Sequence, residues 1–135
     1  MTAQVTGPGS AADDSLTVTA LTSCNEQVLV LRVTGEVDLL SLERLRHHLH
    51  NHMPGAHKGV VLDFTGVSFL AACGLGLLAE LAEQARAHEV TLRLVAHRGA
   101  VLRALHVVGM DGLVPRAATV AEAVVQCFEV TLGPR

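Results

Sequence analysis

The stretch that decides the fold reads Val60-Val-Leu-Asp-Phe-Thr-Gly-Val-Ser-Phe-Leu-Ala-Ala-Cys-Gly-Leu-Gly-Leu-Leu78. Its beginning, Val60–Phe64, is an almost unbroken apolar run that predicts a buried strand, and Thr65-Gly66 predicts a turn after it. Val67–Leu70 then leads into a helix from about Gly74 to His88, because apolar residues recur there at helical spacing. A buried strand followed by an amphipathic helix is a building block of α/β domains.

The residues before this unit predict two strands and one helix. Residues 16–20 alternate between apolar side chains and threonines, which is typical of a half-buried strand, and Val28–Val33 is a continuous aliphatic run. We expect these two strands to form a hairpin through a short polar turn. Apolar residues then recur at helical spacing from Leu39, with Asp38 as the N-cap and Pro54-Gly55 ending the helix.

The residues after the unit predict two more strands and two more helices. Val90–Val95 has the apolar character of a strand, and a third helix follows it, with Gly109 suited to its C-cap. A brief strand near Leu113–Pro115 precedes the last helix. There Thr119 and Glu122 form the T-x-x-E pattern of a capping box.

The predicted order is β-β-α-β-α-β-α-β-α. Strands joined through helices pair mostly in parallel with right-handed crossovers, so we expect an α/β fold. Its sheet would be mixed and mostly parallel, with four to five strands and about four helices. The length of 135 residues suits one domain, which we place at residues 15–132. Residues 1–14 are small and polar and predict a disordered N-terminal arm.

Composition and charge argue against several classes of function. The chain has a net charge of −3 and neither Trp nor Tyr, so it lacks the basic face and aromatic platforms of nucleic-acid binders. Its longest uncharged stretch, residues 64–79, is shorter than a membrane span of roughly 20 residues, and no signal peptide is evident. The three cysteines, Cys24, Cys73 and Cys127, are too widely spaced to suggest a disulfide framework. We expect a cytoplasmic protein that binds neither nucleic acid nor membrane.

The sequence carries no motif that predicts an enzyme, a cofactor or a metal. Gly74-x-Gly76-x-x-Ala79 meets the loose dinucleotide fingerprint, but the acidic residue expected after the next strand is missing, which favours close packing of helix on strand. A histidine cluster has no Cys or acid placed to complete a zinc site, so a polar helix face is favoured. The cluster comprises His47, His48, His50, His52 and His57.

Cys73 lies at the predicted start of the second helix, where exposed N–H groups would favour a thiolate. Two interpretations stay open. In one, Cys73 is a small buried residue that fills space, which we favour because cysteine is usually buried. In the other, it is a redox-sensitive switch.

Several segments together resemble the STAS domain, the fold of bacterial anti-sigma factor antagonists. Val33-Thr-Gly-Glu-Val-Asp38 is similar to that family's strand ending in G-E-[LV]-D, and Val61–Leu70 resembles its central strand and loop. Gly74-Leu-Gly-Leu-Leu78 resembles the helix after the family's phosphorylation loop. Leu92–Val95 and Val107–Val114 match its distal half. The resemblance covers about residues 15 to 130.

The resemblance implies a partner-switching module that works by binding and carries out no reaction. In similar proteins the unphosphorylated domain binds a kinase-type anti-sigma factor and frees a sigma factor. Phosphorylation of a Ser or Thr in a D-[ST]-S-G loop then breaks the complex. In this chain the loop aligns with Ala71-Ala72-Cys73-Gly74, so the phospho-acceptor position is Ala72, which has no hydroxyl. The replacement also removes side-chain N-caps, each worth about 1 kcal/mol.

The surface expected to bind the partner comprises the Glu36–Leu40 corner and the Ala71–Leu75 loop. The loop is uncharged, so docking on it would desolvate no charge. The residues assigned to this surface are Glu36, Asp38, Ala71, Ala72, Cys73, Gly74 and Leu75. An alternative interpretation is that they only pack the start of the helix.

Three functions are compatible with this surface. The domain would act as a permanently dephosphorylated antagonist of a serine-kinase anti-sigma factor. Alternatively, it would serve outside sigma control, as a STAS scaffold or a small subunit of a transport assembly. A third version is a thiol-based, redox-responsive antagonist that acts through Cys73. The sequence does not determine which anti-sigma or sigma factor is involved, or whether the domain forms a weak homodimer.

Overall fold

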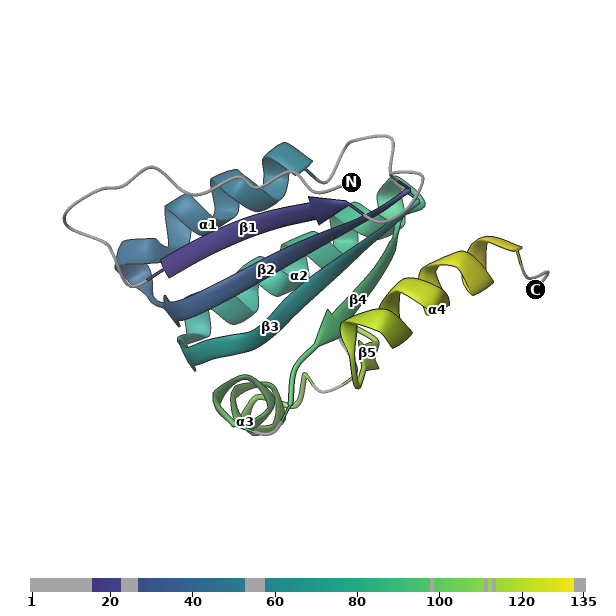
Figure 1. Ribbon diagram of the computed structural model, residues 1–135. Coiled ribbons are helices and arrows are strands. Elements are labelled where there is room, and N and C mark those ends of the chain that lie inside the picture. The colour runs from purple at the N-terminus through teal and green to yellow at the C-terminus, as the bar shows by residue number, and fades with distance from the viewer. Residues whose placement is uncertain are drawn as a thin grey trace.

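The computed structural model describes residues 16–22, 27–52, 58–97, 99–110, 112 and 114–132. Within these ranges a five-stranded sheet is flanked by four helices (Figure 1). The elements in chain order are β1 (Leu16–Thr22), β2 (Val28–Val37), α1 (Leu39–His52), β3 (Gly59–Leu70), α2 (Ala72–Ala87), β4 (Thr91–Val95), α3 (Ala100–Val107), β5 (Arg116–Ala117) and α4 (Val120–Leu132). The expected α/β class and element order are confirmed.

The sheet is mixed, with the strands side by side in chain order. β1 pairs antiparallel with β2, which confirms the expected antiparallel pairing of the first two strands, and the other three pairings are parallel. Because β2, β3 and β4 run in the same direction, the helices that follow them all begin at the carboxyl edge of the sheet (Figure 1). This edge therefore gathers the starts of α1, α2 and α3.

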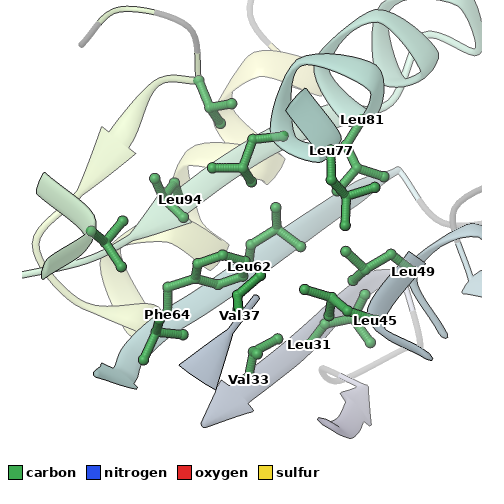
Figure 2. Packing of buried hydrophobic residues seen from close by; sticks show 14 of the residues in the cluster. Leu31, Val33, Val37, Leu45, Leu49, Leu62, Phe64, Leu77, Leu81 and Leu94 are labelled. Carbon is green, nitrogen blue, oxygen red and sulfur yellow. The ribbon is translucent and has the colours of Figure 1, made fainter. Parts of the chain in front are cut away.

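The two faces of the sheet carry separate apolar clusters. α1, α2 and α3 cover one face, where their leucines meet alternate residues of the strands, among them Leu31, Leu62 and Phe64 (Figure 2). α4 covers part of the other face, where Ala123 and Cys127 pack against strand residues of the opposite parity. The continuous aliphatic runs noted in the sequence follow from this arrangement, since both faces of the central strands are buried.

β3 differs from the sequence prediction, because the turn expected at Thr65-Gly66 is absent. The strand runs without interruption from Gly59 to Leu70 and absorbs two extra residues relative to β2. The register shifts lie between Arg32 and Thr34 and between Gly35 and Glu36 on the partner strand. Each is a β-bulge, in which two residues of one strand face one residue of the other. A glycine at position 66 indicates an irregular backbone, and a β-bulge is such an irregularity just as a turn is.

Several boundaries also move. α2 begins at Ala72, two residues before the expected Gly74, and the last strand is Arg116–Ala117 rather than Leu113–Pro115. The capping box of α4 is confirmed in part: Glu122 N donates to Thr119 Oγ1 at 3.1 Å, but the Glu122 carboxylate accepts from Ala118 N, one residue before the expected partner. The boundary shifts are of the size that helix and strand ends commonly show.

Some predictions lie outside the described residues, namely the arm at 1–14, the polar turn before β2 and the helix end at Pro54-Gly55. In the part of the chain that the structure describes, no helix combines the length and the apolar character needed to cross a membrane.

The packing of α4 on the sheet centres on Cys127. This side chain is fully buried, and a Cβ on Gly59 would lie only 2.5 Å from its Sγ atom. Gly59 thus allows α4 to approach the first residue of β3. Burial raises the pKa of the Cys127 thiol above its ordinary value of 9.0, and the positive charge of Arg93 partly opposes this rise.

We expect Cys127 to make the stability of the fold decrease in alkaline solution. As the pH rises through 9.0, the thiol of the unfolded chain ionises while the buried thiol stays protonated. The unfolded state therefore gains stability, and the contribution of the buried thiol is lost above this pH. Urea unfolding gives the free energy of unfolding of the native chain and of Cys127→Ala. The difference between these two free energies should be smaller at about pH 10 than at neutral pH. An equal difference at both pH values would contradict the prediction.

Candidate functional site

The predicted site residues come from two neighbouring strand–helix junctions at the carboxyl edge of the sheet. Val37, the last residue of β2, pairs with Leu70, the last residue of β3. One residue further, Ala71 N donates to the carbonyl oxygen of Val37 at 2.9 Å. The structure therefore brings the Glu36–Leu40 corner and the start of α2 together, although about 30 residues separate them in the chain.

Asp38 and Ser41 build the first junction. Asp38 Oδ1 accepts from Leu40 N at 3.0 Å and from Ser41 N at 3.1 Å, which confirms Asp38 as the N-cap of α1. The Ser41 hydroxyl, fully buried, donates to the carbonyl oxygen of Glu36 at 2.8 Å. The Asp38 carboxylate thus acts in shaping the corner, and the exposed charge at this junction is that of Glu36.

The corner presents large apolar side chains to solvent. Leu39 and Leu40 are 79% and 80% exposed, and Phe69 on β3 is 49% exposed. Phe69 is the register partner of Glu36, so it lies directly beside the corner. The sequence prediction included Leu39 and Leu40 in the Glu36–Leu40 corner without naming them as contact residues, and it missed Phe69. The sequence does indicate that Leu40 is exposed, because Leu40 lies outside the apolar stripe of α1 that Leu42, Leu45 and Leu49 form.

The start of α2 lacks a side-chain cap. Ala71 is its N-cap, with extended backbone and no side-chain hydrogen bond, as the loss of Asp and Ser from the loop predicted. Ala72 is exposed and Cys73 is half-buried against the core. Gly74 and Leu75 are buried, which corrects their assignment to the binding surface, since they lie beneath it and support it. The solvent-facing part is Ala72 with the accessible portion of Cys73.

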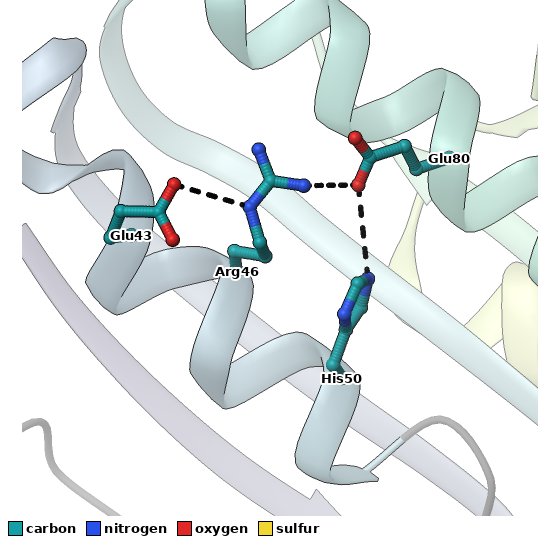
Figure 3. Close-up of polar contacts among 4 residues, drawn as sticks. All are labelled: Glu43, Arg46, His50 and Glu80. Atoms are coloured by element: carbon teal, nitrogen blue, oxygen red, sulfur yellow. Dashed lines mark hydrogen bonds and ion pairs between the residues drawn. The ribbon is translucent and has the colours of Figure 1, made fainter.

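An ion-pair cluster ties α1 to α2 behind this surface (Figure 3). Arg46 on α1 pairs with Glu80 on α2, and its Nε atom lies 3.4 Å from Glu43 Oε2. His50 Nε2 lies 3.9 Å from the same Glu80 oxygen. Arg46 is 28% exposed and Glu80 is 49% exposed, so the pair lies at the surface and contributes at most about 1 kcal/mol. The cluster connects the middle of α1 to the middle of α2.

The histidines of α1 do not form a metal site within the described residues. His48 is 7% exposed and faces the protein interior, although the sequence placed it on a polar face, while His47 is exposed. Among the side chains that the structure describes, no three potential ligands converge. The side chains of His52 and His57 lie outside the description.

Comparisons with known proteins identify the fold and the family. Residues 19–123 match the model of the STAS domain. The anti-sigma-F factor antagonist RsfB of Mycobacterium tuberculosis is 31% identical over 100 residues, which cover 74% of this chain and 80% of RsfB. The crystal structure of an anti-sigma factor antagonist from Mycobacterium paratuberculosis superposes with a TM-score of 0.77 at 26% identity, covering 85% of this chain and 96% of that one.

A more distant structure shows the same fold. The anti-sigma factor antagonist SpoIIAA in its unphosphorylated form superposes with a TM-score of 0.67 at 21% identity, covering 81% of this chain and 94% of that one. The chain belongs to the STAS domain family, and it is similar to members named as anti-sigma factor antagonists.

Two glycines of α2 differ in their surroundings and give a matched test of how tightly the helix start packs. A Cβ on Gly74 would lie 2.5 Å from Leu70 Cδ1 and 2.9 Å from Val37 Cγ1, whereas one on Gly76 would meet nothing within 4 Å. We expect Gly74→Ala to lower the free energy of unfolding by about 1–3 kcal/mol, because two buried side chains must move. Gly76→Ala should raise it by up to about 1 kcal/mol through helix propensity. Urea unfolding measures the free energy of unfolding of both variants. Equal effects of the two substitutions would contradict the close packing at Gly74.

Proposed function

We propose that this chain is an anti-sigma factor antagonist that binds a kinase-type anti-sigma factor and thereby releases a sigma factor. We define its docking surface as Glu36, Leu39, Leu40, Phe69, Ala72 and Cys73. The observation that carries the proposal is the cluster of large exposed apolar side chains at the junctions of β2 with α1 and of β3 with α2. Membership of a family with similar antagonists supports the same conclusion.

The composition of the docking surface suits protein binding. Interface cores are apolar and poor in charge, and a few large side chains usually supply most of the binding energy. Here Leu39, Leu40 and Phe69 would supply the apolar core, with the small Ala72 allowing close approach to the start of α2. Glu36 would lie at the polar rim. The close packing at Gly74 and the hydrogen bond from Ala71 N to the Val37 carbonyl would hold these residues in place before the partner arrives, which would lower the entropic cost of binding.

Ala72 determines how this antagonist would be regulated. It is the exposed first residue of α2, and the family resemblance of the sequence aligns it with the phospho-acceptor position of the D-[ST]-S-G loop. A phosphate there would place up to two negative charges on the docking surface and disfavour binding. With alanine the start of α2 gains no charge, so the chain would remain competent to bind at all times. We propose that it does so in the cytoplasm, where a sigma factor is needed, and without catalysing a reaction.

We expect aspartate substitutions on the docking surface to weaken binding. Leu40→Asp and Phe69→Asp would each place a charge within the apolar core of the interface and should weaken binding by about tenfold or more. Binding is measured by calorimetric titration against the kinase-type anti-sigma factors of the host bacterium, with the anti-sigma-F factor of Mycobacterium tuberculosis included.

Val125→Asp is the matched control. Val125 lies on α4 with 53% exposure, on the other face of the sheet, so its replacement introduces the same charge away from the docking surface. It should bind like the native chain. Equal losses in all three variants, or the absence of binding by the native chain to every anti-sigma factor of its host, would refute the proposed function.

A second experiment tests the locked state. Incubation of the native chain with its anti-sigma kinase and ATP should leave the intact mass unchanged, because Ala72 offers no hydroxyl to the phosphate. The double variant Ala71→Asp with Ala72→Ser restores the acceptor and should gain one phosphate under the same conditions. A phosphate on the native chain would contradict the locked state.

A further inference from the structure

We infer that Asp63 is a positioning residue for the docking surface, because its carboxylate holds the β-bulge that determines which face of the sheet Phe69 occupies. This inference rests on the proposed function, since it concerns how the same surface is built. Asp63 is 3% exposed, yet it lies on the sheet face opposite α1 and α2, with the same parity as Val61. A buried carboxylate requires partners for its oxygen atoms.

Three donors meet the Asp63 carboxylate, and two of them come from the bulged residue itself. Thr65 donates to Asp63 Oδ1 both from its backbone N, at 3.1 Å, and from its hydroxyl, at 2.7 Å. Arg32 on the neighbouring strand donates from Nε to Asp63 Oδ2 at 3.1 Å. The carboxylate therefore links the bulge to β2 at the position where the register changes.

The register shift begins immediately after this contact. Asp63 pairs with Arg32, but Thr34 pairs with Gly66, so Phe64 and Thr65 together face Val33 and Thr65 belongs to the bulge. Gly66 suits this geometry, because a Cβ there would lie 2.6 Å from Thr34 Cγ2. The bulge thus brings the backbone of β3 unusually close to a β2 side chain.

The bulge has a defined consequence for the residues beyond it. Successive side chains of a strand alternate between faces, so one extra residue reverses the facing of all that follow. With both bulges present, Val67 and Leu70 lie in the core and Phe69 lies on the surface beside Glu36. If the bulge at Thr65 alone were lost, Val67 would turn outward and Phe69 would turn toward the core. The placement of Phe69 therefore depends on the contacts of Asp63.

The experiment measures both the placement of residue 69 and the binding. The chain contains neither Trp nor Tyr, so Phe69→Trp introduces a single indole whose fluorescence reports its own exposure. Acrylamide quenching of this indole is compared with and without Asp63→Ala, which removes both acceptor oxygens. Binding to the anti-sigma factor is measured separately, with Phe69 retained. Circular dichroism under the same conditions establishes that each variant is folded.

Thr65 supplies milder variants in case Asp63→Ala does not fold. Thr65→Val removes the hydroxyl donor at nearly constant shape, whereas Thr65→Ser keeps both donors and is the matched control. We expect Asp63→Ala to change the quenching of the indole and to weaken binding by about tenfold or more. Thr65→Val should change the quenching and the binding in the same direction but by less. Thr65→Ser should leave the quenching and the binding as in the native chain.

Each other outcome overturns the inference. If Asp63→Ala and Thr65→Val leave quenching and binding unchanged, the carboxylate does not hold the bulge in place. If binding is lost while quenching is unchanged, Asp63 acts by a route other than the position of residue 69. If quenching changes while binding persists, the docking surface does not depend on that position. Failure of the native chain to bind would refute the proposed function, whereas the quenching measurement would still test the bulge.

Discussion

Parallel pairing of β2 with β3 is the constraint on which the rest of the structure depends. It places the carboxyl ends of both strands at one edge of the sheet, and the hydrogen bond from Ala71 N to the Val37 carbonyl extends the pairing to the first residue after β3. The first halves of both strands are buried on two faces. The starts of α1 and α2 therefore cannot separate without breaking the central pairing of the sheet.

The helices strengthen this arrangement from outside the sheet. Leucines of α1 and α2 interlock with alternate residues of β2 and β3, and Arg46 pairs with Glu80 across the gap between the helices. Gly74 permits the close approach of α2 to the ends of both strands. A surface mounted on such packed elements is held rigidly. Rigid mounting would suit the proposed docking surface, which would present one fixed shape to a partner.

The uncapped start of α2 shows how local stability and function are related in this chain. A Ser or Asp at its N-cap would stabilise the helix by about 1 kcal/mol, yet alanine occupies that position. The backbone compensates in part, because the Ala71 carbonyl accepts from Gly74 N and Leu75 N and the Ala71 N–H is bonded to Val37. The sheet and the helix core therefore hold the start of α2 without help from a polar side chain, and this start stays uncharged.

The amino-acid sequence by itself determined the order of the elements, the pairing of the first two strands, the apolar stripes of α1 and α2 and the Asp38 cap. Those features depend on side-chain periodicity and on hydrogen bonds between residues close in the chain. The structure alone revealed the bulges of β3, the exposure of Phe69 and the burial of Gly74. These depend on the register of β3 against β2. That register is set by contacts such as Asp63 with Arg32, which are 31 residues apart and leave no periodic trace in the sequence.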